Sequence, residues 1–254
     1  MANIVKLSKV TPNRSDWSVR VRVEKMWWTL TLESGEGLSF LFVDDEGTRM
    51  HAFVDNFYHG KKFKGLLQEG QWKMITGFKV LIVEKEIRMT KERKEIALTI
   101  ETQVDDAEPF HGFIPLDLIP FQDVQNGMVH GGTSYTRDFL GVIDSVQDLG
   151  VIEDDSIPRN RHNNDPKTTT MINFVLQDND GYHLRCRVKG PLANWFKRYW
   201  LIYGESGTII CLLTNWRVVG RDGAIQVDDA GDISTFEYDP DGRDRLEYDE
   251  MSDQ

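Results

Sequence analysis

Cationic and aromatic side chains follow one another near the start of the chain. Arg20 and Arg22 alternate with three valines, Lys25 comes next, and Trp27 and Trp28 close the segment. Alternation with a period of two is typical of a strand that buries one face and exposes the other. Guanidinium and ammonium groups bind phosphates, and exposed aromatic rings stack on bases with about 1–3 kcal/mol each. The segment therefore offers the residue types that a surface needs to bind a nucleic acid strand.

A second cationic strand is expected in the other half of the chain. His183, Arg185 and Arg187 are spaced two residues apart, so they share one face of a strand. We expect Arg185 and Arg187 to lie across a binding groove, and Arg217 to add positive charge nearby.

Further cationic candidates lie in the first half, on the expected third and fourth strands: Arg49, His51, Lys73 and Lys79. Three lysines in an expected helix, Lys61, Lys62 and Lys64, have two interpretations. They form either a phosphate-binding cluster or the solvated face of that helix, and the second interpretation is the commoner one for a run of charges.

The aromatic residues also have a structural interpretation. Because adjacent strand residues face opposite sides, one of Trp27 and Trp28 is expected in a core. Four aromatic residues of the second half recur at helical spacing, which favours a core seam over a stacking surface: Trp195, Phe196, Tyr199 and Trp200.

The sequence gives little support for catalysis, and we expect a protein that is not an enzyme. It has no phosphate-binding GxxxxGK[ST] loop, no HExxH and no GxSxG, and its six histidines are dispersed. Cys186 and Cys211 have no CxxC partner, so we expect buried thiols in a reducing compartment and no metal site. No cofactor is expected. No apolar run is long enough for a membrane span or a secretory signal.

The charge is unevenly distributed along the 254 residues. The net charge is −11 for the whole chain, but it is +3 for residues 1–104 and −9 for residues 228–254. Local patches decide what a groove attracts, so the acidic total does not exclude a polyanionic ligand.

The order of expected elements in the first half is that of a five-stranded Greek-key barrel, the OB-fold, in which a helix lies between strands three and four. The helix is expected over Asn56–Leu67. The strands are expected over Trp17–Trp28, Leu38–Val43, Arg49–Val54, Trp72–Val83 with a bend at Gly77, and Ile96–Ile100.

The same order recurs after about 120 residues, which indicates two copies of one barrel. Each copy has an acidic, glycine-ended turn between two apolar strands. The second set of strands is expected over Phe139–Val146, Met171–Leu176, His183–Val188, Ile209–Val219 and Ala224–Val227, with a helix in Gly190–Tyr203.

The predicted architecture is mainly β, with two tandem OB-fold barrels and short helices. The first barrel is assigned to residues 1–104, a connection to 105–135, the second barrel to 136–227 and a disordered acidic tail to 228–254. A long polar loop is expected over residues 153–170, between the first two strands of the second barrel.

Several stretches resemble the plant proteins that are similar to the large subunit of replication protein A. The resemblance spans about residues 15–220 and is carried by residues 17–28, 38–52, 69–78, 118–124 and 139–146. It implies tandem OB-folds that bind single-stranded DNA in the nucleus. With two cysteines, the chain lacks the four-cysteine zinc ribbon of the full-length large subunit.

The leading hypothesis is non-catalytic binding of single-stranded DNA in replication, repair, recombination or telomere maintenance. RNA remains an open alternative, because stacking surfaces do not sense the 2′-hydroxyl. The rival hypothesis is a protein-interaction module that docks a partner through strand edges or the acidic tail, with nucleic-acid binding weak or lost.

Overall fold

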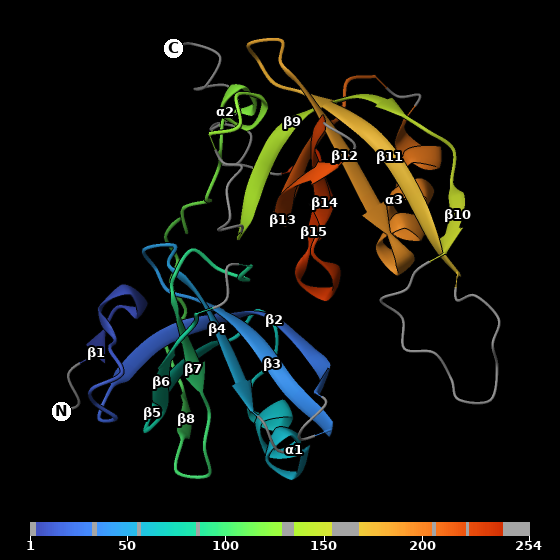
Figure 1. Ribbon diagram of the computed structural model, residues 1–254. Coiled ribbons are helices and arrows are strands. Elements are labelled where there is room, and N and C mark those ends of the chain that lie inside the picture. Colours follow the sequence, from blue (N-terminus) through green and yellow to red (C-terminus); the bar gives the residue numbers. More distant parts are fainter. Residues whose placement is uncertain are drawn as a thin grey trace, which may run out of the picture. The chain divides into compact units, whose positions relative to one another are not determined.

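The computed structural model describes the chain in two compact units that divide between Asp117 and Leu118 (Figure 1). The division falls within the connection expected over 105–135. The described residues are 4–31, 35–54, 57–84, 87–128, 135–153, 168–204, 207–221 and 224–240.

The first unit is a strongly curled sheet with the strand order β6-β7-β4-β3-β2-β5-β8, and β1 pairs with β2. Its elements are β1 (Ile4–Val5), the 3-10 turn η1 (Leu7–Lys9), β2 (Ser18–Thr31), β3 (Gly35–Val43), β4 (Arg49–Val54), α1 (Phe57–Leu66), β5 (Trp72–Thr76), β6 (Lys79–Ile82), β7 (Lys94–Ala97) and β8 (Gln103–Asp106). The expected bend at Gly77 separates β5 from β6. Gly77 has a φ of +69°, which a side chain would strain.

The alternation of β2 places its valines in the core of the first unit and its arginines outside. Val19, Val21 and Val23 are fully buried against β3, β4 and the Phe63 side chain of α1. The pairing of β2 with β3 then shifts between Val23 and Lys25, where one extra residue forms a β-bulge. The bulge reverses which side chains face outward in the rest of β2.

The second unit contains a closed five-stranded barrel, in which β9, β11, β12, β14 and β13 pair in a ring. Its elements are α2 (Phe121–Gln125), β9 (Thr136–Val146), β10 (Gly150–Glu153), β11 (Thr168–Gln177), β12 (His183–Lys189), α3 (Gly190–Tyr203), β13 (Ile210–Arg221), β14 (Ala224–Asp229), the 3-10 turn η2 (Gly231–Ile233) and β15 (Thr235–Tyr238). The parallel pair of the ring is β12 with β14, which matches β4 with β7 in the first unit. The prediction of a mainly β chain with two OB-type units is confirmed; the second unit closes into a five-stranded barrel, whereas the first is a curled half-barrel.

Both predicted acidic turns are built in the same way. Asp44 accepts hydrogen bonds from the backbone N–H groups of Glu46 (3.1 Å) and Thr48 (2.9 Å). Asp178 accepts one from the N–H of Tyr182 at 2.8 Å. A carboxylate that caps its own turn explains why an acidic residue begins each hairpin.

Aromatic packing dominates the core of the second unit. Phe174 stacks on Phe196 of α3 at 4.3 Å between ring centroids and meets Trp216 edge-on at 5.9 Å. Cys186 and Cys211 are buried in the same core, and desolvation raises the pKa of both thiols.

The predicted tail begins later than the sequence suggested. Residues 228–240 complete β14 and form η2 and β15, and β15 pairs with β13. Phe236 and Tyr238 point to one side of β15 and contact the Phe196 ring. This packing outweighs the acidic composition of the segment. Residues 241–254, to which the rest of the tail prediction applies, lie outside the described residues, as do residues 154–167 of the predicted loop.

The predicted seam of α3 is only half buried. Phe196 is fully buried and Trp200 packs against the core, but Trp195 is 51% exposed and Tyr199 is 41% exposed. The helix therefore presents a second aromatic face away from the core.

Candidate nucleic-acid interface

Three rings form a row on the outer face of the first unit. His51 and Phe53 follow each other on that face of β4, and Trp27 reaches His51 from β2. The ring centroids of Trp27 and His51 are 5.8 Å apart, as are those of His51 and Phe53, and both pairs are stacked. Trp27 is only 8% exposed and Phe53 is half-buried, so Phe53 offers more open ring surface than Trp27.

Trp28 lies on the opposite side of β2, as expected for a neighbour of Trp27. Its ring packs on α1, where a Cβ added to Gly60 would come within 3.2 Å of it. Lys64 lies over the same ring at 5.8 Å. Trp28 is 36% exposed and contributes no ring to the outer-face row.

Most predicted cations of the first unit are neutralised by acids. His51 Nδ1 lies 3.1 Å from Glu95, and Lys73 is buried with its ammonium 2.5 Å from Asp106. The remaining pairs are Arg20 with Asp45 at 3.8 Å, Lys25 with Glu69 at 3.8 Å and Arg49 with Glu24 at 2.9 Å. Within the described ranges, Arg22 and Lys79 are the cations predicted on first-unit strands that have no ion pair.

Arg20 is further enclosed by the connection that follows β8. Its guanidinium lies 5.2 Å from the Trp72 ring centroid and 6.0 Å from that of Phe110. Phe110 in turn meets Trp72 edge-on at 5.9 Å. Arg20 therefore sits between two rings and an acid and is not an open phosphate contact.

Two rows of mostly polar side chains cross the outer face of the second barrel. The register of β11 with β12 places Val175 beside Arg185 and Asn173 beside Arg187. The pairing with the neighbouring strands extends both rows. The first row contains Ser145, Val175, Arg185 and Gln226. The second row contains Gln147, Asn173, Arg187, Asp228 and Arg217.

The two predicted arginines of β12 differ in their environment. Arg187 is buried and forms an ion pair with Asp228 on the neighbouring strand. Arg217 is half-buried on the other side of Asp228, and burial lowers its pKa. Arg185 is exposed and has no ion pair in the described part of the chain, and His183 lies 4.0 Å from Asp144.

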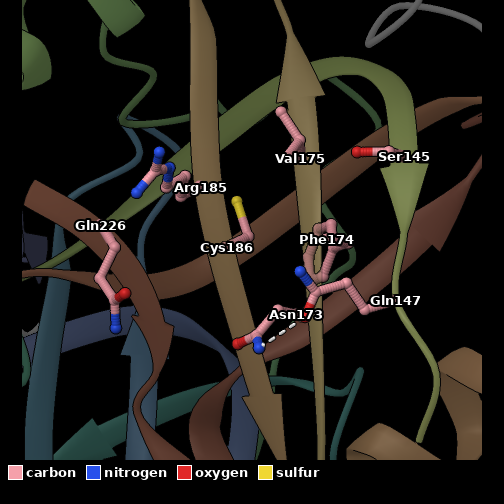
Figure 2. A pocket seen from close by; sticks show the side chains of 8 residues that line it. All are labelled: Ser145, Gln147, Asn173, Phe174, Val175, Arg185, Cys186 and Gln226. Carbon is pink, nitrogen blue, oxygen red and sulfur yellow. Dashed lines mark hydrogen bonds between the residues drawn. The ribbon is translucent and has the colours of Figure 1, made fainter.

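A pocket of about 450 Å³ opens beside Arg185 (Figure 2). Besides that arginine its side chains are mostly uncharged hydrogen-bonding groups, and Asn173 donates a hydrogen bond to Gln147 at 3.0 Å. The lining residues are Ser145, Gln147, Asn173, Phe174, Val175, Arg185, Cys186 and Gln226.

Sequence reasoning missed four outer-face residues: Phe53, Gln147, Asn173 and Gln226. Two of them had a detectable signal. Phe53 stands two residues after His51, and Asn173 alternates with the buried Ile172 and Phe174. Gln147 directly follows β9 and Gln226 lies in β14, and their neighbours are known only from the hydrogen bonds and pairing of these segments.

A second, apolar groove lies between α3 and β15. It has a volume of about 460 Å³ and contains the exposed rings of Trp195 and Tyr199. Its complete lining is Leu192, Trp195, Tyr199, Thr235, Phe236, Glu237 and Tyr238.

Among the helices of the described ranges, none combines the length and apolar character that crossing a bilayer requires. In the same ranges, no three His, Cys, Asp or Glu side chains gather in a way that could hold a metal ion.

The chain is similar to known proteins in sequence and in fold. Residues 8–127 match the family model described as domain of unknown function DUF223. A stretch of 144 residues is 23% identical to a 70 kDa DNA-binding subunit of replication protein A from Arabidopsis thaliana. The chain is similar to the large subunit of replication protein A. The match covers 55% of this chain and 23% of the Arabidopsis protein, so the chain spans less than a quarter of the relative's length.

A solved structure of a replication protein A heterotrimer bound to single-stranded DNA has the same fold. It aligns with a TM-score of 0.62 and 16% sequence identity, over 98% of this chain and 55% of the other.

Proposed function

We propose that the chain binds single-stranded DNA without catalysing a reaction, through the outer faces of its two barrels. The observation that carries this proposal is the pocket beside Arg185, where an exposed cation without an acidic partner among the described residues adjoins a row of polar side chains. An arginine in this position can bind a phosphate or a base edge.

The two units contribute different chemistry in this proposal. The first supplies the stacked row of Trp27, His51 and Phe53, whose half-buried Phe53 ring can accept a base. Because most of its cations are paired with acids, its contribution is mainly stacking. The second unit supplies the charge of Arg185 and hydrogen-bonding groups.

The similarity to a DNA-binding polypeptide of replication protein A supports a nuclear role in replication, repair, recombination or telomere maintenance. The match covers only 23% of the Arabidopsis protein, so we propose this role for the two described units and not the full set of activities of that protein.

Fluorescence polarisation with single-stranded DNA of about 20 nucleotides, matched duplex DNA and matched RNA tests the proposal. We expect the single strand to bind more tightly than the duplex. Arg185→Ala should weaken binding about 5- to 30-fold, as loss of a charge-assisted contact implies. Arg198→Ala is the matched control, because Arg198 is an exposed arginine of α3 outside the pocket. Equal affinity for single strand and duplex, or preference for RNA, would contradict the proposal.

The apolar groove favours a second candidate function, the docking of a protein partner. β15 pairs with β13, and no described strand pairs with its other edge. A free edge beside the rings of Trp195 and Tyr199 suits an extended segment that adds a strand and inserts apolar side chains at alternate positions.

Site-specific photo-crosslinking tests this candidate, with a photoreactive residue in place of Glu237 and nuclear extract as the source of partners. Crosslinks to a partner should be lost in Trp195→Ala and kept in Arg185→Ala. Crosslinks that persist unchanged in Trp195→Ala would exclude the groove as the docking site.

A further inference from the structure

We propose that the pocket beside Arg185 takes a guanine base and makes strand binding dependent on sequence. The inference rests on the proposed function and adds to it the identity of the base. The hydrogen-bonding groups that the protein itself leaves unused in this pocket support it.

Two amide carbonyls in the pocket are free acceptors. The Asn173 amide nitrogen donates to Gln147 at 3.0 Å, and the Gln226 amide nitrogen donates to Asp228 at 2.7 Å. These bonds fix both amides with their oxygens uncommitted, since no other described group bonds to them. The pocket therefore offers two fixed acceptors from β11 and β14.

The donors of the pocket come chiefly from Arg185. Its neighbour Arg187 is committed to Asp228, whereas Arg185 has no protein partner in the described ranges. A guanidinium presents a planar fork of N–H groups, and its commonest specific base contact is bidentate to O6 and N7 of guanine.

Guanine is the base that matches this combination. It carries acceptors O6 and N7 for the arginine, and the donors N1–H and N2–H₂ for the carbonyls of Asn173 and Gln226. Adenine would direct its N6 donor at the arginine. Thymine has a single N–H donor, and cytosine directs its N4 donor group where an acceptor is required.

The site is not an aromatic stacking surface. Phe174 is the aromatic residue of its lining, and its ring is buried in the core against Phe196. Contacts to the base edge distinguish the four bases, whereas stacking is tolerant of sequence. A volume of about 450 Å³ leaves room for one base with water around it.

The test uses fluorescence polarisation with oligo-dT of about 20 nucleotides that carries a single central dG, dA or dC, or none. We expect the dG oligonucleotide to bind about tenfold more tightly than the others, within the usual effect of one bidentate contact. Replacing the dG by 7-deazaguanine, which lacks N7, or by hypoxanthine, which lacks the N2 amine, should each remove much of this preference. These analogues leave the protein unchanged.

Arg185→Lys keeps the positive charge but removes the fork. It should abolish the dG preference, and Arg198→Lys, outside the pocket, should leave both the dG preference and the oligo-dT affinity unchanged. Equal binding of all four oligonucleotides, or a dG preference that survives in Arg185→Lys, would overturn the inference and leave the proposed function standing. Failure of every oligonucleotide to bind would overturn the proposed function itself.

Discussion

Arg185 and Arg187 stand two residues apart on one strand, but only Arg187 is part of the folded framework. Arg187→Ala would leave Asp228 as a buried charge without its ion-pair partner. We expect the free energy of unfolding to fall by about 3–5 kcal/mol, the usual effect of breaking a buried pair. Arg185→Ala should change it by less than about 0.5 kcal/mol. Urea denaturation of both variants measures the difference, and equal effects would contradict it.

Asp229 should make stability depend on pH. Burial raises the pKa of this carboxyl, although it accepts hydrogen bonds from Lys189 N–H and Gly231 N–H. Between the ordinary pKa of about 3.9 and the raised value, the folded state holds a proton that the unfolded state has released. The free energy of unfolding therefore falls as pH rises through this window.

Asp229→Asn removes that titration. We expect the free energy of unfolding of this variant, minus that of wild type, to increase from pH 4 to pH 7, whatever the difference is at pH 4. Urea denaturation at several pH values checks the trend, with Asp232→Asn at an exposed neighbouring position as the control. A difference that is constant with pH would show that Asp229 titrates alike in both states.

At the scale of elements, β15 should be essential to the second unit. Ending the chain after Ala230 removes the Phe236 and Tyr238 rings from Phe196, and the Thr235 carbonyl that accepts from Trp216 at 2.7 Å. We expect a loss of at least about 3 kcal/mol of unfolding free energy, comparable to removing one large buried ring. Ending the chain after Pro240, which keeps all of β15, is the control. Equal stability of the two truncations would contradict this role.

Local periodicity accounts for the elements that sequence could predict. Valines alternate with arginines in β2, and acidic turns separate apolar strands, so the order of both barrels could be read in advance. β15 was missed because its two rings, Phe236 and Tyr238, alternate with Glu237 and Asp239 inside an acidic stretch. Only their contact with Phe196, distant in the chain, makes that segment a strand.

The candidate site was less predictable, for a different physical reason. A cation can be assigned to the outer face from spacing alone, but its acidic partner depends on strand register. Lys73 meets Asp106 because β5 pairs with β8, and Arg187 meets Asp228 because β12 pairs with β14. Sequence spacing therefore predicted which arginines and lysines lie on the outer face, but not which of them lack an acidic partner.

At the scale of the whole molecule, charge pairing sets the response to salt. Among the cations predicted on strands, those without an ion pair in the described ranges and open to phosphate are Arg22, Lys79 and Arg185. Two or three phosphate contacts at about 0.7 each give a log–log slope of affinity against salt of about −1.4 to −2.1. Polarisation titrations from low to high NaCl measure this slope. A slope steeper than about −4 would mean that the ion pairs of the first barrel open to bind DNA.

The extra residue of the bulge in β2, Glu24, affects how the outer face of the first unit can change by mutation. It sets the frame of every side chain after Val23, so that Trp27 lies beside His51 and Trp28 lies against α1. Deletion of Glu24 would remove the bulge while Trp27 stayed paired with Ser39 and Trp28 with Leu38, and it would also remove the acid that neutralises Arg49. One small genetic event would thus take an acid away from a cation beside the ring row, while both indoles kept their faces of the strand.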